Sequence, residues 1–252
     1  MIVQRFLQWI ETAPPGRRAE ATHALARAYL YSDIDEGTRY AMEAAMTVLL
    51  DDPSPEVRYS LADALGAYSD VPRHIVLALA SDQAEIAALV LSRSPVFIDA
   101  ELVDLAAAAE TRLQVAIASR QNLSSAVAAA IAEVGEEAAC RSLIDNRSAD
   151  IARISLRRMA ERFADEPGMR ETMLARDDLP PEIRQLLIQR LSAALGDLVV
   201  VKSWVSEDRA RAVTRDACDR ATVALAAETE TEELVALVEH LRVTGQLTTA
   251  LL

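Results

Sequence analysis

The sequence contains few of the residues that form tight turns, disulfide frameworks or zinc sites. It has seven glycines and an aromatic content of 4% in 252 residues. Its two cysteines, Cys140 and Cys218, occur without a CxxC motif or a zinc-ligand spacing. We therefore expect both thiols to be free and buried, as in a protein of a reducing compartment, rather than joined in a disulfide.

Long hydrophobic segments and clusters of lysine are also missing. No run approaches the ~18 apolar residues of a membrane span, and residues 1–10 lack the apolar core and cleavage site of a signal peptide. Lys202 is the only lysine, and the net charge is −13. Because phosphate groups repel such a chain, we expect a cytoplasmic protein that binds neither nucleic acid nor membranes.

The residues that are abundant favour helices. Hydrophobic residues make up 51% of the chain and are mainly alanine, leucine, valine and isoleucine. One motif, D-D-x-x-P-E-(V/I)-R, occurs twice, at residues 51–58 and 177–184. The leucines that follow it correspond as well, because Leu61 and Leu65 match Leu187 and Leu191.

A looser series of arginines lies between the two copies of the motif. Arg93, Arg120, Arg147 and Arg176 are spaced by 27, 27 and 29 residues, and we place them at the starts of helical units. A nearly constant period of this length indicates stacked helical repeats. We therefore predict an all-α fold, a right-handed α-solenoid of short antiparallel helix pairs.

The predicted domain organisation has two parts. Residues 1–196 form the helical repeat domain, and residues 197–252 form a C-terminal helical segment packed on it. Residues 198–201 (Leu-Val-Val-Val) are either a short extended linker or the buried tail of the preceding helix, and we favour the tail. Because the chain stops at Leu251-Leu252 within an apolar pattern, we expect either a fragment of a longer protein or an end that packs on a partner.

Residues 50–66 resemble the bacterial HEAT-type repeat, and residues 174–183 resemble the leucine-rich-variant repeat. Together, over about residues 20–195, they are similar to an uncharacterised bacterial family with HEAT-like repeats, a domain of unknown function. The resemblance implies helical repeats and a chain that continues further in other members. That family has no established reaction, so the resemblance implies no catalytic residues.

No motif of a catalytic, cofactor or metal site is present. The sequence has no phosphate-binding glycine loop, HExxH, GxSxG or CxxC. Residues 33–37 (Asp-Ile-Asp-Glu-Gly) superficially suggest a calcium loop, but its twelfth position is Ala44, so a capped helix start is the better interpretation. His23, His74 and His240 have no ligand at helical spacing, and we expect His240 to be exposed. We predict no catalytic residue, cofactor or metal.

The arginine series is the strongest candidate for a binding site. If the repeats stack in register, Arg93, Arg120, Arg147 and Arg176 form a row that binds an acidic partner through guanidinium–carboxylate pairs. The competing interpretation is structural: each arginine donates to the carbonyl groups that end a helix, or to a neighbouring aspartate. The sequence favours the structural interpretation.

The predicted function is a noncatalytic scaffold that binds another protein or a peptide through a repeat surface. A homo-oligomer that forms through the apolar C-terminal end is also consistent with the sequence. Two alternatives remain at this point: a nucleic-acid-processing enzyme on a HEAT-like fold, and a helical repeat enzyme that handles a small molecule. The first needs a basic groove with an aromatic side chain, and the second needs a deep polar pocket.

Overall fold

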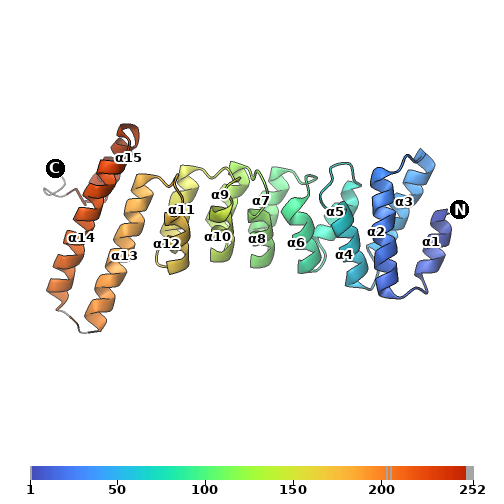
Figure 1. Cartoon of the computed structure of the whole chain (residues 1–252), viewed down its shortest axis with the longest axis horizontal. Helices are drawn as coiled ribbons and strands as arrows, with labels where there is room; N and C mark the ends of the chain where they lie inside the picture. Colours follow the sequence, from blue (N-terminus) through green and yellow to red (C-terminus); the bar gives the residue numbers. More distant parts are fainter. Residues whose placement is uncertain (1, 203, 205, 248–252) are drawn as a thin grey trace. The chain divides into compact units, whose positions relative to one another are not determined.

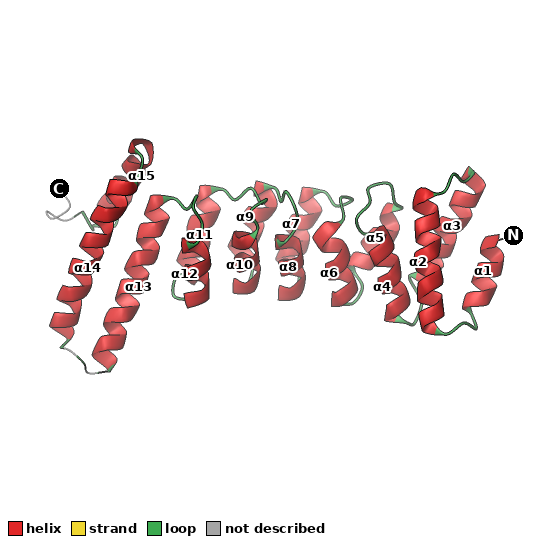
Figure 2. Ribbon diagram, viewed as in Figure 1, coloured by secondary structure: helices red, strands yellow, loops and turns green. Residues whose placement is uncertain are grey.

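The computed structural model describes residues 2–202, 204 and 206–247, and within these residues it contains helices and no strands (Figures 1 and 2). The helices are α1 (Ile2–Ile10), α2 (Pro15–Tyr31), α3 (Glu36–Leu49), α4 (Pro55–Leu65), α5 (Arg73–Ala80), α6 (Ala84–Arg93), α7 (Asp99–Ala108), α8 (Thr111–Ala118), α9 (Ser125–Val134), α10 (Glu137–Asp145), α11 (Arg153–Phe163), α12 (Pro167–Leu174), α13 (Pro181–Val201), α14 (Glu207–Glu228) and α15 (Thr231–Val243). The all-α prediction is confirmed.

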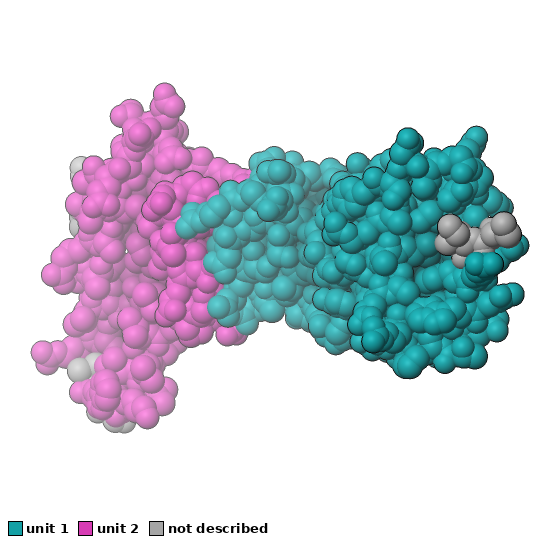
Figure 3. Space-filling view, turned by 45° about the vertical axis from the view of Figure 1, so that its right-hand side comes forward, with its two compact units in different colours: residues 1–150 teal, residues 151–252 magenta. Residues whose placement is uncertain are grey.

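The chain forms two compact units, residues 1–150 and residues 151–252, which are coloured separately in Figure 3. The boundary expected between residues 196 and 197 lies within α13, which continues to Val201. Residues 198–201 are therefore the tail of a helix, as predicted. The tail is not buried, however, because Leu198 is 48% exposed and Val201 is 78% exposed.

In the first unit, alternate helices pack against one another. Helices α2, α4, α6, α8 and α10 contact in succession, and on the other side α1 contacts α3 and α7 contacts α9. Fully buried leucine and isoleucine side chains fill the space between the helices, among them Leu61, Leu65, Ile86, Ile117 and Ile131. The apolar stripe of each short helix is thus covered by its neighbours.

The second unit is built around α13. This helix contacts α11, α14 and α15. Its first half is buried, with Ile183 and Leu187 at or below 1% exposure, whereas Leu191 is 36% exposed. The C-terminal half of α13 therefore packs against α14 on one side of the helix, and apolar side chains on another side are exposed.

Both copies of the repeated motif open a helix in the same way. Pro55 is the first residue of α4, and Pro181 is the first residue of α13. Proline suits this position because its fixed φ matches the helix and its missing N–H has no intrahelical acceptor there. At residues 33–37, Asp35 caps α3 by accepting hydrogen bonds from the backbone N–H (2.9 Å) and the hydroxyl (2.7 Å) of Thr38.

Polar side chains tie the loops of successive helix pairs in the first unit. Asp52 accepts hydrogen bonds from Arg18 at 2.7 and 2.8 Å, and Arg58 donates to the Asp52 carbonyl and to the Asp82 carboxylate. Farther along, Asn146 donates to the carbonyls of Ala118 (2.9 Å) and Arg120 (2.6 Å). We call this set the loop ladder; its members are Arg18, Asp52, Arg58, Asp82, Arg120 and Asn146.

Candidate functional site

The tyrosines are concentrated in one part of the first unit. All five lie between residues 29 and 68, and four of them are exposed. Tyr31 is 58% exposed, Tyr59 is 44% exposed and Tyr68 is 37% exposed. Tyr29 is buried, and Tyr40 lies on α3 at 75% exposure. Because aromatic residues are only 4% of the chain, four exposed tyrosines in one segment mark this part of the surface as a candidate binding site.

Three of these tyrosines belong to one continuous surface across α2, α4 and α6. On α2, helical spacing aligns His23, Arg27 and Tyr31 in a single stripe, and the Arg27 guanidinium lies 5.1 Å from the centre of the Tyr31 ring. The Tyr31 ring meets the Tyr68 ring edge to face, with centroids 5.8 Å apart, and their hydroxyl groups are hydrogen-bonded.

Asp63 joins the three helices of this surface. Its carboxylate lies 2.8 Å from the Arg93 guanidinium and 3.9 Å from Nε2 of His23. Tyr59 precedes Asp63 by one helical turn and therefore lies beside it on α4. We call the set the tyrosine surface; its members are His23, Arg27, Tyr31, Tyr59, Asp63, Tyr68 and Arg93.

The four arginines predicted to form a row occupy four different environments. Arg93 is the last residue of α6 and pairs with Asp63. Arg120 follows α8 and donates to the carbonyls of Leu91 and Ser94 at the end of α6, and burial lowers the pKa of its guanidinium. Neither residue is at the start of a helix, in contrast to the expectation from their spacing.

The other two arginines of the series also follow helices. Arg147 follows α10 and is exposed. Arg176 follows α12 in the second unit; it is 6% exposed and holds the Asp178 carboxylate at 2.6 and 2.9 Å. Arg120 and Arg176 thus engage helix-end carbonyls and an aspartate, as the structural interpretation expects. A partner-binding role for Arg93, Arg120, Arg147 and Arg176 stays a prediction.

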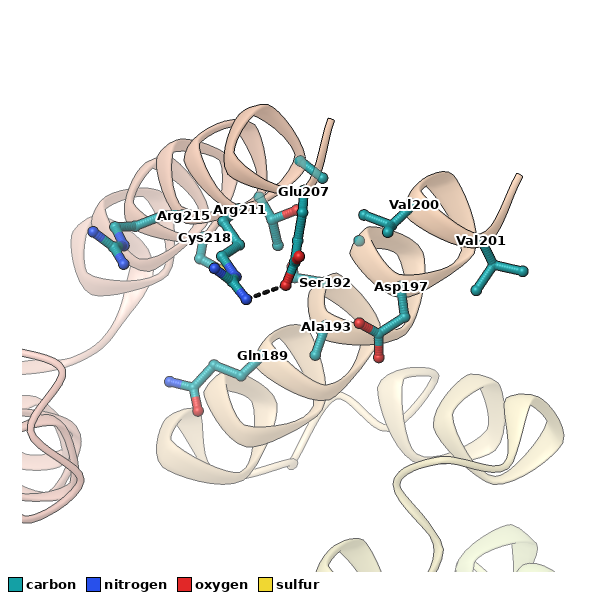
Figure 4. Close-up of a pocket in the computed structure, with 13 residues that line it drawn as sticks. Gln189, Ser192, Ala193, Asp197, Val200, Val201, Glu207, Arg211, Arg215 and Cys218 are labelled. Carbon is teal, nitrogen blue, oxygen red and sulfur yellow. Dashed lines mark hydrogen bonds and ion pairs between the residues drawn. The ribbon is translucent and has the colours of Figure 1, made fainter. Parts of the chain in front are cut away.

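In the second unit, two grooves are lined by residues of α13 and α14 alone. The larger, of about 680 Å³, has walls of mixed character, and Figure 4 shows Gln189, Asp197 and Val200 of α13 along one wall and the Arg211–Glu207 ion pair of α14 along the other. The smaller, of about 300 Å³, has mostly apolar walls, which include Leu195, Val199, Val213 and Ala217. The helices approach closely at Gly196, where an added Cβ would lie 3.2 Å from the Thr214 hydroxyl.

A buried carboxylate marks the other end of this unit. The Glu182 side chain, 1% exposed, accepts two hydrogen bonds of 2.5 Å from Arg153, and Arg157 approaches to 3.7 Å. His240 of α15 faces the same cluster. Its Nε2 is buried without a hydrogen-bond partner, and burial together with the nearby Arg157 lowers the pKa of the imidazole. The expectation of an exposed His240 was therefore wrong, because α15 packs against α13 here.

Other sites of chemistry were sought in the residues that the structure describes. Within that part of the chain, no three His, Cys, Asp or Glu side chains gather closely enough to hold a metal ion. Both cysteines are free thiols, as predicted. Cys140 is buried, as expected, whereas Cys218 is only half-buried. Among the same residues, no helix has both the length and the apolar character needed to cross a membrane. The apolar end at Leu251-Leu252 lies outside the described residues.

Comparison with known proteins yields a single finding. No curated protein and no solved structure matches the chain. The model of a family described as uncharacterised proteins conserved in bacteria, DUF2336, matches residues 86–252. This match includes the α13–α14 hairpin and begins after the tyrosine-bearing helices α2, α3 and α4. It covers about two thirds of the sequence, so the chain belongs to the DUF2336 family of uncharacterised bacterial proteins.

Proposed function

We propose that the protein is a noncatalytic scaffold, an α-solenoid of HEAT-like helix pairs in the bacterial cytoplasm, which binds another protein through the tyrosine surface. The observation that carries the proposal is the exposure of Tyr31 on α2, Tyr59 on α4 and Tyr68 in the loop after α4, in a chain with few aromatic residues. Tyrosine and arginine are enriched where protein interfaces gain most of their affinity, because each buries a large area and retains a polar end.

The contacts within the tyrosine surface also support binding without a large rearrangement. The Tyr31–Tyr68 ring contact, the Arg27–Tyr31 stacking and the Asp63–Arg93 ion pair fix side chains that would otherwise lose rotamer freedom in a complex. Binding to preorganised side chains costs less conformational entropy. Arg27 remains exposed, so it provides a guanidinium group for a carboxylate of an acidic partner.

The experiment compares crosslinking at two exposed tyrosines. A photoreactive phenylalanine analogue replaces Tyr59 within the tyrosine surface or Tyr40 outside it, and the full chain is irradiated in the native cell. We expect one discrete heterologous product from position 59 and none from position 40, although Tyr40 is the more exposed residue. Equal labelling at both positions would contradict the proposal.

Affinity for the crosslinked partner then tests the contribution of the side chains. The double variant Tyr31→Ala/Tyr59→Ala should bind about tenfold to a hundredfold more weakly, whereas Tyr40→Ala should bind like the unaltered protein. Melting temperatures within a few degrees of the unaltered protein would show that the loss arises from binding and not from unfolding.

A further inference from the structure

The second unit contains a cavity of about 370 Å³ where α14 and α15 both pack on α13. Its lining comes from α13, α14, the end of α15 and the turn that follows α15. We call it the glutamine cavity; its polar lining is Gln185, Gln189, Arg215, Asp219, Thr222 and Gln246. Gln189 and Arg215 also line the larger groove of Figure 4, so the two spaces adjoin.

The turn after α15 provides one wall of this cavity. Gly245 has a φ of 68°, a left-handed conformation that ends many helices and that glycine adopts without strain. The chain folds back there, because the backbone N–H groups of Gln246 and Leu247 donate to the Leu241 carbonyl at 2.8 and 3.2 Å. The Gln246 side chain then accepts a hydrogen bond from Gln189 of α13. This contact fixes the turn against the floor of the cavity.

A buried hydrogen-bond acceptor without a partner lines the cavity. Gln185 is 2% exposed, and its amide nitrogen donates to the Thr222 hydroxyl at 2.7 Å. Thr222 in turn donates its single hydroxyl hydrogen to the Cys218 carbonyl at 2.8 Å, so the orientation of the glutamine amide is fixed. The Gln185 amide oxygen is left without a hydrogen-bond partner among the residues that the structure describes. Because buried acceptors are almost always paired, this oxygen indicates a site for a donor group of a ligand.

Two opposite charges line the same cavity on α14. Arg215, Asp219 and Thr222 follow one another at intervals of four and three residues, which places them in one stripe of the helix. Within the described part of the chain, neither Arg215 nor Asp219 takes part in an ion pair, whereas the neighbouring Asp216 and Arg220 pair with each other. The rise of the helix separates the two charged positions by about 6 Å. A carboxylate therefore lies next to the position of the buried amide, and a guanidinium group lies one turn farther on.

This order of groups matches the two charged ends of a free amino acid. An ammonium group has three N–H donors, which can satisfy the Gln185 oxygen and the Asp219 carboxylate together. A guanidinium group binds a carboxylate through paired hydrogen bonds, which is the chemistry that Arg215 offers. Leu241, at 4% exposure, adds an apolar surface for the carbon atoms of the ligand. The volume of about 370 Å³ lies near the lower end for small-molecule sites and favours a single amino acid over a longer peptide.

We propose that the glutamine cavity binds a free amino acid, with its ammonium group on Gln185 and Asp219 and its carboxylate on Arg215. The competing arrangement is an ion pair between Arg215 and Asp219, which lie four residues apart on the same helix. The site belongs to the second unit and uses no residue of the tyrosine surface.

Titration calorimetry of the full chain with each of the standard L-amino acids tests for the ligand. We expect at least one of them to bind with a dissociation constant below about 1 mM. For that amino acid, the amine that lacks its carboxylate and the acid that lacks its ammonium group should each bind at least about tenfold more weakly, because each loses charge-assisted hydrogen bonds. Absence of binding within this limit by every amino acid, or equal binding of the amine, would overturn the proposal.

Substitutions at the two charged residues assign the ends of the ligand. Asp219→Asn should weaken binding of the amino acid at least about tenfold. Asp216→Asn is the matched control on the same helix, because the Asp216 side chain is 67% exposed and pairs with Arg220, and it should bind like the unaltered protein. Arg215→Gln should weaken the amino acid at least about tenfold and leave the binding of its amine analogue unchanged. Unaltered binding in both Asp219→Asn and Arg215→Gln would show that these residues only pair with each other.

The variant Gln185→Met distinguishes a binding role from a structural one. Methionine fills a similar volume and removes the buried oxygen, so the melting temperature should stay the same or rise while binding falls at least about tenfold. A lower melting temperature with unaltered amino-acid binding would make Gln185 structural and overturn the proposal. Should this variant unfold, Asp219→Asn and Arg215→Gln decide the outcome, since Asp219 is only half-buried and Arg215 is exposed.

Discussion

Replacing Arg153 by methionine should destabilise the second unit through the carboxylate that it leaves behind. The Glu182 side chain is 1% exposed, and Arg153 provides both of its short hydrogen bonds. Methionine preserves much of the apolar stem of arginine and removes the charge. Removing one member of a buried ion pair typically costs about 3–5 kcal/mol, because the remaining charge stays desolvated.

The structure places this cost at or just below the lower end of that range. Arg153 is itself 44% exposed, and Arg157 remains 3.7 Å from the same carboxylate. Exposure to solvent screens part of the interaction. We therefore expect a loss of about 2–3 kcal/mol in the free energy of unfolding, which for a unit of about 100 residues lowers the melting temperature by roughly 8–20 °C.

The effect depends on pH in a defined direction. Burial alone would raise the pKa of the Glu182 carboxyl, but the hydrogen bonds from Arg153, a backbone hydrogen bond and the positive charges of Arg153 and Arg157 together outweigh burial and hold that pKa below its usual value. A lowered folded-state pKa stabilises the fold above the pKa of the unfolded chain, and this stabilisation is lost as the pH falls through the folded-state value. The difference between the unaltered protein and Arg153→Met should therefore be largest near neutral pH and shrink in acid.

Thermal unfolding followed by circular dichroism measures the loss, with Arg242→Met as the control. Arg242 makes two hydrogen bonds to Glu239, but both side chains are more than half exposed, so the control should change stability by less than about 0.5 kcal/mol. The double variant Arg153→Met/Glu182→Leu should recover much of the loss, because neither charge remains. Equal losses in Arg153→Met and Arg242→Met would refute the reasoning, as would a double variant less stable than Arg153→Met.

Three further predictions follow from burial and charge. Leu61 and Leu187 are fully buried, so Leu61→Ala and Leu187→Ala should each lower the free energy of unfolding by about 2–5 kcal/mol in urea titrations. Leu191→Ala should lower it by less than about 1 kcal/mol. Small effects at both buried positions would contradict the packing. Arg120→Met should lower the free energy of unfolding by about 1–3 kcal/mol, because it leaves two helix-end carbonyl groups without their hydrogen-bond donor. Arg93→Met should lower it by less than about 1 kcal/mol, and calorimetry can compare the two variants. Fluorescence anisotropy with random duplex DNA at physiological salt should show no binding, given the net charge of −13, and submicromolar binding would revive the nucleic-acid alternative.

Local sequence rules predicted the helices well, because the deciding residues act within one turn. Pro55 and Pro181 open helices for a reason that needs no tertiary contact. The correspondence of the two motifs weakens with distance from the proline. Leu61 and Leu187 are both fully buried, but Leu65 is buried whereas its counterpart Leu191 is 36% exposed. Burial at that distance depends on which helix lies opposite, and this information is not in the motif.

The candidate sites were harder to predict for the same reason. Regular spacing suggested that Arg93 and Arg120 are equivalent, yet Arg93 pairs with a surface aspartate while Arg120 donates to buried carbonyls. The clustering of tyrosines between residues 29 and 68 was visible in the sequence, whereas the contact of Tyr31 with Tyr68 required the packing of α2 on α4. The cluster around Glu182 joins residues about 29 positions apart and had no local signal.

The loop ladder also has a consequence for how the length of this chain can change during evolution. Its side chains reach no farther than the neighbouring helix pair, as Arg58 reaches Asp82 and Asn146 reaches the carbonyl of Arg120. Duplication or deletion of a whole helix pair therefore leaves most of the remaining connections intact. A single residue inserted into one loop would instead displace the groups that connect it to the loops on both sides. Selection should accordingly tolerate variation in the number of helix pairs more readily than variation in the lengths of these loops.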